Sequence, residues 1–236
     1  MTRRRWIADA WTSTTATLTG EQAAHLARVL RAEPGQVFDV VAGGFLHRAE
    51  ITRVGDGEVV FELHEELESD AALPLHLLLA VFKFDHMEWA IEKATELGVG
   101  RIAPVVARRT EKHLAQAAAK RAERWRRIAL EASKQSRRTT IPEIADPAGL
   151  KQALEAEKSP TRILLSETEQ ATSLAVALAS APEGDLALAI GPEGGWTAEE
   201  MALFTDHQWR PVTLGPRILR AETAAIAAIA IVSSHR

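Results

Sequence analysis

From Leu75 onward, short apolar runs alternate with longer segments of helical periodicity, and this alternation limits the fold more than any other pattern. The apolar runs resemble buried strands and cover 76–81, 101–106, 162–165, 186–190 and 212–214. The helical segments cover about 85–97, 114–135, 168–180, 197–207 and 221–234. Strands that alternate with helices predict an α/β fold, a parallel sheet covered by helices on both faces. Ligands of such sheets bind beyond the carboxyl ends of the strands.

The first 70 residues follow a different pattern of short β-like runs and tight turns. The runs cover 37–41, 45–51 and 58–63, and turn signals stand at 34–35, 43–44 and 55–57. One helix is expected from about 21 to 30, with Thr19 as its N-cap. This pattern predicts a small β-barrel. The acidic stretch that ends at Pro74 is expected to be a linker, so we divide the chain into domains at 1–72 and 73–236.

Composition excludes several classes of protein. Hydrophobic content of 46% and charged content of 25% are ordinary for a globular domain. The longest apolar run, Ala224 to Val232, is far shorter than the roughly 20 residues that span a bilayer, so no membrane partner is expected. No apolar segment follows the N-terminal arginines, so no signal peptide is expected. The absence of cysteine excludes disulfides, thiolate zinc sites and cysteine nucleophiles, and it fits a cytoplasmic location.

Charge is segregated along the chain although the net charge is only −4. Residues 108–138 hold eleven Lys or Arg against three Glu, and residues 56–72 hold seven Asp or Glu without a Lys or Arg. Such a basic segment indicates a nucleic-acid surface or the solvated face of a helix, and both interpretations stay open. Trp125 within it could stack on a base or anchor the helix in the core.

Two glycine-bearing loops, 190–195 and 214–223, each follow an apolar run and lead into a helix. Glycine lets the main chain approach a bound molecule closely, so the loops indicate a ligand held by backbone groups. Thr197 and Glu200 have the spacing of a capping box, which predicts a helix start there. The first loop matches neither a dinucleotide fingerprint nor a P-loop, and a plain strand-to-helix turn remains the alternative.

The second loop carries charges that a structural turn does not require. Arg217 and Arg220 flank an apolar pair and are suited to phosphate or carboxylate. Glu222 is favourable at a helix start whatever its function, and it could pair with Arg220. We favour a functional role and take these three residues as catalytic candidates.

Other motifs do not indicate a metal. Glu88, Glu92 and Glu96 stand one helical turn apart, but Lys93 lies among them without a partnering histidine, which favours a solvated face. The eight histidines lack the H-x-x-H and H-E-x-x-H spacings. The nucleophile elbow of serine hydrolases is missing as well. Gly98 is the expected C′ residue of this helix.

Four segments together resemble the RsmE family of SPOUT RNA methyltransferases along nearly the whole chain. They are HLARVLR at 25–31, EKATELGV at 92–99, GPEGG at 191–195 and LGPRILRAETA at 214–224. The resemblance implies methylation of N3 of a uridine in the 16S rRNA of the small ribosomal subunit. The alternatives are a SPOUT enzyme with another RNA target and a non-catalytic, RNA-binding ribosome-assembly protein.

The same resemblance implies an architecture. It gives an N-terminal PUA-like β-barrel and a SPOUT-type parallel sheet with a C-terminal trefoil knot, an exception to the rule of unknotted chains. It further implies a cytoplasmic homodimer with active sites near the dimer interface. The cofactor would be S-adenosylmethionine, held by the backbone of three loops, the third of them at 164–167.

The residues that the resemblance assigns fall into three groups. Cofactor binding is expected from Leu165, Ser166, Glu167, Ile190, Gly191, Glu193, Gly194, Gly195, Leu214, Gly215, Ile218, Leu219, Arg220 and Thr223. RNA contacts are expected from Arg3, Arg4, Arg28, Arg31, Lys83, Arg137 and Arg138. Arg217 and Arg220 would stabilise negative charge on the uridine or hold phosphate, and Glu222 would orient an arginine or receive a proton.

The chain departs from the family pattern at three places. Lys134 stands where a glutamate is expected before Gln135, Trp6-Ile7 replaces an N-terminal aromatic pair, and Phe84 replaces a smaller residue. The departures concern the RNA contacts rather than the cofactor loops.

Overall fold

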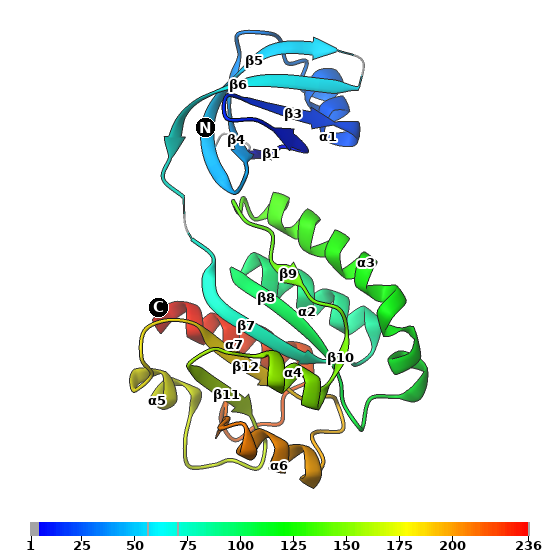
Figure 1. Ribbon diagram of the computed structural model, residues 1–236, viewed down its shortest axis with the longest axis vertical. Coiled ribbons are helices and arrows are strands. Elements are labelled where there is room, and N and C mark those ends of the chain that lie inside the picture. Colours follow the sequence, from blue (N-terminus) through cyan, green and yellow to red (C-terminus); the bar gives the residue numbers. More distant parts are fainter. Residues whose placement is uncertain (1–4, 56, 70, 236) are drawn as a thin grey trace. The chain divides into compact units, whose positions relative to one another are not determined.

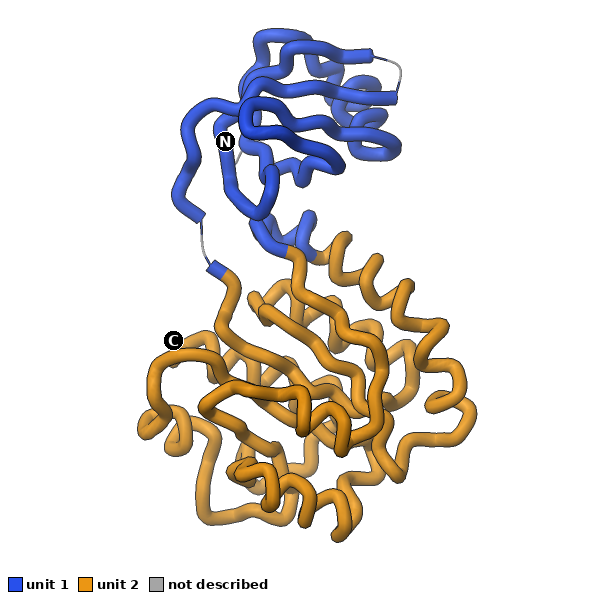
Figure 2. Tube along the Cα trace, in the orientation of Figure 1, with its two compact units in different colours: residues 1–71, 133–140 blue, residues 72–132, 141–236 orange. Residues whose placement is uncertain are grey.

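The computed structural model describes residues 5–55, 57–69 and 71–235, and these form two compact units (Figure 2). Unit 1 contains the described residues up to 71 together with residues 133–140. Unit 2 contains residues 72–132 and the described residues from 141 onward. The segment 133–140, which the sequence places in the 73–236 domain, therefore groups with unit 1. Arg5 Nη1 donates a 2.7 Å hydrogen bond to the carbonyl oxygen of Arg137 and fixes the segment there.

Unit 1 is built on a six-stranded sheet in the order β1-β4-β5-β6-β3-β2. The strands are β1 (Arg5–Ile7), β2 (Ala10–Trp11), β3 (Thr15–Thr19), β4 (Val37–Ala42), β5 (Phe45–Gly55) and β6 (Glu58–Leu67). β1 pairs with β4 in parallel, and the other pairs are antiparallel. Alternate side chains such as Leu18, Val40 and Phe61 fill one core, as strand periodicity requires.

The helix expected at 21–30 in unit 1 is split into two forms. α1 (Gly20–Ala24) runs directly into a π-helical turn, η1 (His25–Val29), where Leu30 N donates to His25 O at 3.1 Å. Thr19 occupies the N-cap position with an extended backbone, but its side chain does not cap the helix. The Thr19 hydroxyl and main-chain N–H both donate to Asp9 Oδ2, at 3.2 and 2.7 Å, which satisfies them elsewhere.

Unit 2 is built on a seven-stranded sheet in which every strand pair is parallel, as the alternating pattern predicts. The order is β10-β8-β7-β12-β11-β13, with β9 pairing to β8 beside it. The strands are β7 (Leu73–Ala80), β8 (Val99–Val106), β9 (Glu143–Ile144), β10 (Ala148–Gly149), β11 (Thr161–Leu165), β12 (Leu186–Ile190) and β13 (Arg210–Val212). β13 thus ends two residues before the expected 212–214 run does.

Helices cover both faces of this sheet (Figure 1). α2 (Phe84–Glu96), α3 (Lys112–Gln135), α5 (Leu174–Ala179) and α7 (Ala221–His235) share one core. α4 (Leu150–Ala156) and α6 (Ala198–Asp206) share the other. Successive residues of β7 enter opposite cores, since Leu77 and Leu79 belong to the first and Leu78 to the second. The strands are therefore apolar without interruption, as is typical of a sheet buried on both faces.

The helix expected at 168–180 is only α5, six residues long. Before it, Glu169 Oε1 accepts hydrogen bonds from Ala171 N and Thr172 N, at 2.6 and 3.1 Å. These local hydrogen bonds stabilise a turn where the sequence predicted the first turns of the helix. The helix then begins after Ser173, whose hydroxyl accepts from Val176 N.

Other local expectations are confirmed. Thr197 and Glu200 form the capping box at the start of α6. Gly98 follows α2 with a φ of +97°, the left-handed conformation that favours glycine. Within the described ranges, no helix combines the length and the apolar character needed to cross a membrane.

Candidate functional site

Three loops of unit 2 meet at one edge of the sheet because of the strand order. β12, β11 and β13 are neighbours and run parallel, so their carboxyl ends lie side by side. The loops that follow these strands are the three that the sequence singled out. A main-chain hydrogen bond of 3.0 Å from Ser166 N to Val212 O joins the loop after β11 to the end of β13.

The loop after β12 is packed so tightly that its glycines are required. A Cβ on Gly191 would lie 3.0 Å from Trp196 Nε1. Gly195 has a φ of +69°, and a Cβ there would lie 3.2 Å from Glu167 Oε1 in the loop after β11. The Glu167 carboxylate of the loop after β11 therefore lies against Gly195 of the loop after β12, which joins the two loops.

Two arginines that the sequence analysis did not single out form hydrogen bonds here, one to this loop and one to the helix that follows it. Arg109 Nη1 donates a 2.6 Å hydrogen bond to the carbonyl oxygen of Gly194. The main-chain N–H of Arg108 donates to Glu200 Oε1 at 2.8 Å, while Glu200 Oε2 accepts from Thr197 N at 2.8 Å. Glu200 is buried, so the capping box also ties α6 to the connection after β8. In the sequence, the only signal for a role of these two arginines was their position just after a predicted strand of the parallel sheet.

The loop after β13 presents its charges to solvent. Gly215 has a φ of +114°, and its N–H donates to Thr213 Oγ1 at 3.1 Å. Arg217 and Arg220 are exposed, and Ile218 between them is 84% exposed. An apolar side chain so exposed beside two cations is unusual for a structural turn and fits a surface that a ligand covers.

Glu222 is buried immediately after this loop, with 3% of its surface exposed. Its Oε1 lies 2.8 Å from His86 Nδ1 in the first turn of α2. The expected pairing with Arg220 is thus replaced by a hydrogen bond to a histidine. Burial acts to raise the pKa of Glu222, but hydrogen bonds from His86 and its own backbone N–H, with the charges of His86 and Arg220, hold it below its ordinary value.

His86 was missed because its partner is 136 residues away and the histidines were judged only by metal spacing. It follows β7, whose carboxyl end lies beside that of β12. Thr110 Oγ1 donates at 3.0 Å to the carbonyl oxygen of Val81 in this connection. The connections after β7 and β8 therefore lie at the same edge as the two glycine-bearing loops and the loop after β11, and they complete the site.

Two buried polar atoms of the site have no hydrogen-bond partner among the described residues, namely Glu222 Oε2 and Trp196 Nε1. Buried polar atoms are rarely left in this state. With the glycines that a Cβ would obstruct, they fit a site whose polar ligand supplies the missing partners. The three loops can therefore accommodate a small polar molecule through backbone and buried polar groups.

The expected RNA contacts divide between the units. In unit 1, Arg28, Arg31 and Arg137 are exposed, while Arg138 is half-buried and its burial lowers its pKa to about 10. In unit 2, Lys83 is exposed just before α2. Arg3 and Arg4 lie outside the described residues.

The basic helix α3 has a mixed character. Trp125 is fully buried and packs edge-on against Phe84 with ring centroids 5.9 Å apart, so the stacking interpretation for this tryptophan is wrong. Arg121 and Arg124 both pair with Glu88, at 3.3 and 2.7 Å. Part of the basic segment is therefore the paired, solvated face of a helix.

The carboxylates of α2 are engaged with cations. Lys93 Nζ lies 2.7 Å from both Glu92 and Glu96. Among the described residues, no three His, Asp or Glu side chains are grouped so that they could hold a metal ion.

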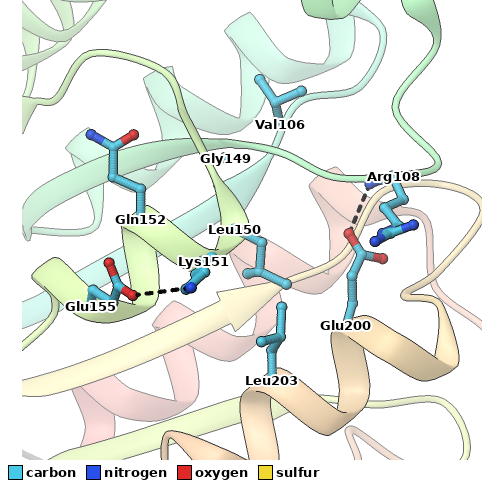
Figure 3. Close-up of a pocket in the computed structure, with 9 residues that line it drawn as sticks. All are labelled: Val106, Arg108, Gly149, Leu150, Lys151, Gln152, Glu155, Glu200 and Leu203. Carbon is cyan, nitrogen blue, oxygen red and sulfur yellow. Dashed lines mark hydrogen bonds and ion pairs between the residues drawn. The ribbon is translucent and has the colours of Figure 1, made fainter.

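A pocket of about 610 Å³ opens on unit 2 between β8, α4 and α6, and it shares Arg108 and Glu200 with the connection after β8 described above (Figure 3). Its lining residues are Val106, Arg108, Gly149, Leu150, Lys151, Gln152, Glu155, Glu200 and Leu203. None of the residues that the sequence assigned to cofactor or catalysis lines it. The glycine-loop edge, rather than this pocket, therefore carries the chemistry-bearing residues.

Comparison with known proteins gives consistent results. An RNA methyltransferase domain family matches residues 69–233, and an RNA methyltransferase PUA domain family matches residues 18–63. The ribosomal RNA small subunit methyltransferase E of Bacillus subtilis is 32% identical over 229 residues, 93% of this chain and 90% of the relative. The protein of the same name from Synechocystis is 35% identical over 224 residues, 93% of this chain and 73% of the relative.

A crystal structure shows the same similarity. The ribosomal RNA small subunit methyltransferase E of Neisseria gonorrhoeae, solved bound to S-adenosyl methionine, has a TM-score of 0.83 and 31% identity to this chain. The match covers 99% of this chain and 98% of the other.

Proposed function

This chain belongs to the RNA methyltransferase family that includes ribosomal RNA small subunit methyltransferase E, and from this we propose that it methylates N3 of a uridine in 16S rRNA, with S-adenosylmethionine as the methyl donor. One observation carries the proposal: three glycine or polar loops follow three adjacent parallel strands, at the edge where a buried glutamate is hydrogen-bonded to a partly exposed histidine. The relatives named for small-subunit rRNA supply the substrate class.

The cofactor would be held mainly by main-chain groups of the three loops. Gly191 and Gly195 carry no side chain that would separate a ligand from these backbones, and the left-handed Gly215 shapes the last loop. The remaining proposed binding residues lie in the same loops, and Thr223 is exposed at the start of α7. S-adenosylmethionine supplies an electrophilic methyl group on a sulfonium.

The charged residues would prepare the uridine. N3 is a weak nucleophile while it carries its proton, so the site must favour the uridinate as the proton departs. Arg217 and Arg220 are exposed beside the cofactor loops and would stabilise that negative charge or hold a neighbouring phosphate. Glu222 is buried and would act indirectly, through the His86 side chain that it contacts.

Unit 1 would dock the RNA. Its PUA-family match supports this role, and Arg28, Arg31 and Arg137 offer exposed cations for phosphate. Lys83 of unit 2 would contact the RNA close to the reacting base. Arg3, Arg4 and Arg138 remain part of the proposed RNA surface.

The proposal extends to assembly and location. We propose a cytoplasmic homodimer in which a trefoil knot includes the last cofactor loop. A pocket of about 450 Å³ between α2 and α7, together with Trp89 at 47% exposure, supports a partner on this face. Thr223 lines the same pocket, which supports an active site close to the interface.

The test is methylation of small subunits or 16S rRNA from a strain that lacks the enzyme, followed by mass mapping of the modified nucleoside. We expect one N3-methyluridine with the wild-type protein, and strongly reduced methylation with folded Arg220→Ala and Glu222→Gln proteins. Full activity in both variants would remove these residues from the mechanism. Calorimetry should show binding of S-adenosylmethionine, and its absence would favour a non-catalytic assembly protein. A methyl group on another base or RNA would favour a different SPOUT specificity.

A further inference from the structure

We propose that His86 is the general base that removes the N3 proton of the uridine, with Glu222 as the residue that positions it. This inference rests on the proposed function and names a base for it. Two observations support it: the 2.8 Å contact between His86 Nδ1 and Glu222 Oε1, and the location of this pair against the last cofactor loop.

The contact with Glu222 determines which nitrogen of the His86 imidazole carries the lone pair. Glu222 is a buried acceptor held in its ionised form, so the Nδ1 atom that faces it carries a hydrogen. In the neutral imidazole, Nε2 then has the lone pair. The same division of roles, with a buried carboxylate on Nδ1 and a basic Nε2, is used by histidine bases in hydrolases.

The free nitrogen is accessible. The His86 side chain is 31% exposed, whereas Glu222 is almost entirely enclosed. Glu222 from α7 and Asp85 from α2 face the imidazole, and Arg220 before α7 acts on Glu222 through its charge. Asp85 Oδ2 lies 3.7 Å from Nε2, which exceeds a hydrogen bond, and the Asp85 side chain is 80% exposed. Nε2 therefore faces Asp85 across a long ion pair but makes no hydrogen bond to it, and it can accept a proton from a substrate.

The position suits the reaction. His86 lies in the first turn of α2, just after the carboxyl end of β7, and Lys83 is exposed three residues earlier. Its partner Glu222 comes two residues after Arg220 of the last cofactor loop. The proposed base would thus lie between the RNA-facing cations and the cofactor loops. Two elements form it, because α2 carries His86 and α7 carries Glu222.

The proposed step balances as follows. The N3–H bond breaks and the proton moves to His86 Nε2, which leaves the electron pair on N3. N3 forms a bond to the methyl carbon while the bond from that carbon to sulfur breaks, and its electrons return to sulfur. The imidazolium formed on His86 is stabilised by the Glu222 carboxylate and later loses its proton to solvent.

His86→Asn and His86→Gln are the test variants, with His113→Asn as the matched control on a histidine of the same unit that is 73% exposed and distant in sequence from His86 and Glu222. At neutral pH we expect kcat to fall about 100-fold or more in the His86 variants, the usual scale for a lost general base. His113→Asn should retain the wild-type kcat. Calorimetry should give all three variants a Kd for S-adenosylmethionine close to the wild-type value, which shows that the site is folded.

The pH profile separates a base from a structural role. A variant without the base should regain rate as the pH rises, because the uridine then loses its N3 proton unaided. RNA that carries 5-fluorouridine at the target, with a more acidic N3, should likewise reduce the deficit. A His86 variant that keeps the wild-type rate at neutral pH, or whose deficit is the same at every pH and for both uridines, would overturn the proposal.

A readout without turnover completes the test. Nitrogen-15 NMR of labelled histidine should show Nδ1 protonated and Nε2 unprotonated in the neutral wild-type protein, and His86→Asn assigns the signal. A neutral His86 that carries its proton on Nε2 would also overturn the proposal. If the wild-type protein fails to form N3-methyluridine on any rRNA, the proposed function itself fails, whatever the tautomer.

Discussion

At the scale of single residues, unit 2 contains a third buried acid besides Glu200 and Glu222, namely Glu157 at the amino end of the sheet. It is 2% exposed, and its Oε1 accepts a 2.8 Å hydrogen bond from Ser159 N. His76 Nδ1 lies 3.1 Å from its Oε2. Burial acts to raise the pKa of Glu157, but the hydrogen bonds from Ser159 and the contact with His76 outweigh it and hold the pKa below its ordinary value.

The lowered pKa gives a prediction for Glu157→Gln. Because the folded state holds the carboxylate more tightly than the unfolded state, its contribution is present at neutral pH and is lost as the pH falls through the folded pKa. We expect Glu157→Gln to reduce the free energy of unfolding by about 1–3 kcal/mol at pH 7, and by less under acid conditions. Urea denaturation at several pH values measures this.

Glu155→Gln is the control, because Glu155 is exposed and forms only a 3.9 Å ion pair with Lys151. It should change stability by at most about 0.5 kcal/mol at any pH. A Glu157→Gln effect that is equally small, or that grows as the pH falls, would contradict the assignment.

At the scale of elements, the α-helices α3 and α6 each end on a left-handed residue that is not glycine, as does the π-helical turn η1 with Arg31 at a φ of 51°. Arg137 after α3 has a φ of 62°, and Gln208 after α6 has a φ of 61°. In each case the next N–H bonds back across the helix end, from Arg138 to Ser133 O and from Trp209 to Phe204 O. Glycine is preferred at this C′ position because other residues are strained there. An exposed arginine kept in such a conformation is consistent with a role in binding.

Arg137→Gly and Gln208→Gly should therefore behave alike in stability and differently in RNA binding. Both should leave the free energy of unfolding unchanged or raise it by up to about 1 kcal/mol, since relief of strain exceeds the entropy cost of glycine. Only Arg137→Gly should weaken binding to an rRNA fragment and reduce the salt slope, by about one phosphate contact. Fluorescence anisotropy at several salt concentrations measures this, and equal RNA affinity in both variants would exclude Arg137 from the interface.

The elements also show what the sequence could predict. The long apolar strands of unit 2 and its helices α2, α3, α6 and α7 were found because their apolar residues recur at strand or helix spacing. The short helix α4 was missed, and α5 is shorter than predicted. β9 and β10, two residues each, were missed because they exist only through pairing with β8. The glycine loops were found because glycine and strand ends are local signals. His86 was missed because only the fold brings it to Glu222.

At the scale of the whole molecule, the exposed face of α2 and α7 gives a prediction about assembly. Trp89 is 47% exposed and lines the pocket between these helices, together with Ile226 and Ala227 of α7. We expect the protein to sediment as a dimer. Trp89→Glu should sediment as a monomer, because dimerisation would bury the introduced carboxylate without an opposite charge beside it. Analytical ultracentrifugation measures this. Trp11→Glu, at a 56% exposed tryptophan of unit 1, should remain dimeric, and an unchanged Trp89→Glu dimer would place the interface elsewhere.

The order of strands in unit 2 has a consequence for the nascent chain. β12 is inserted between β7 and β11, so the strands that flank it become joined only when residues 186–190 have been translated. Every loop that would grip the methyl donor follows β11 or a later strand. Most of this polypeptide must therefore be synthesised before the protein can bind the methyl donor and modify RNA. Synthesis of the protein is thereby separated in time from its action on ribosomes.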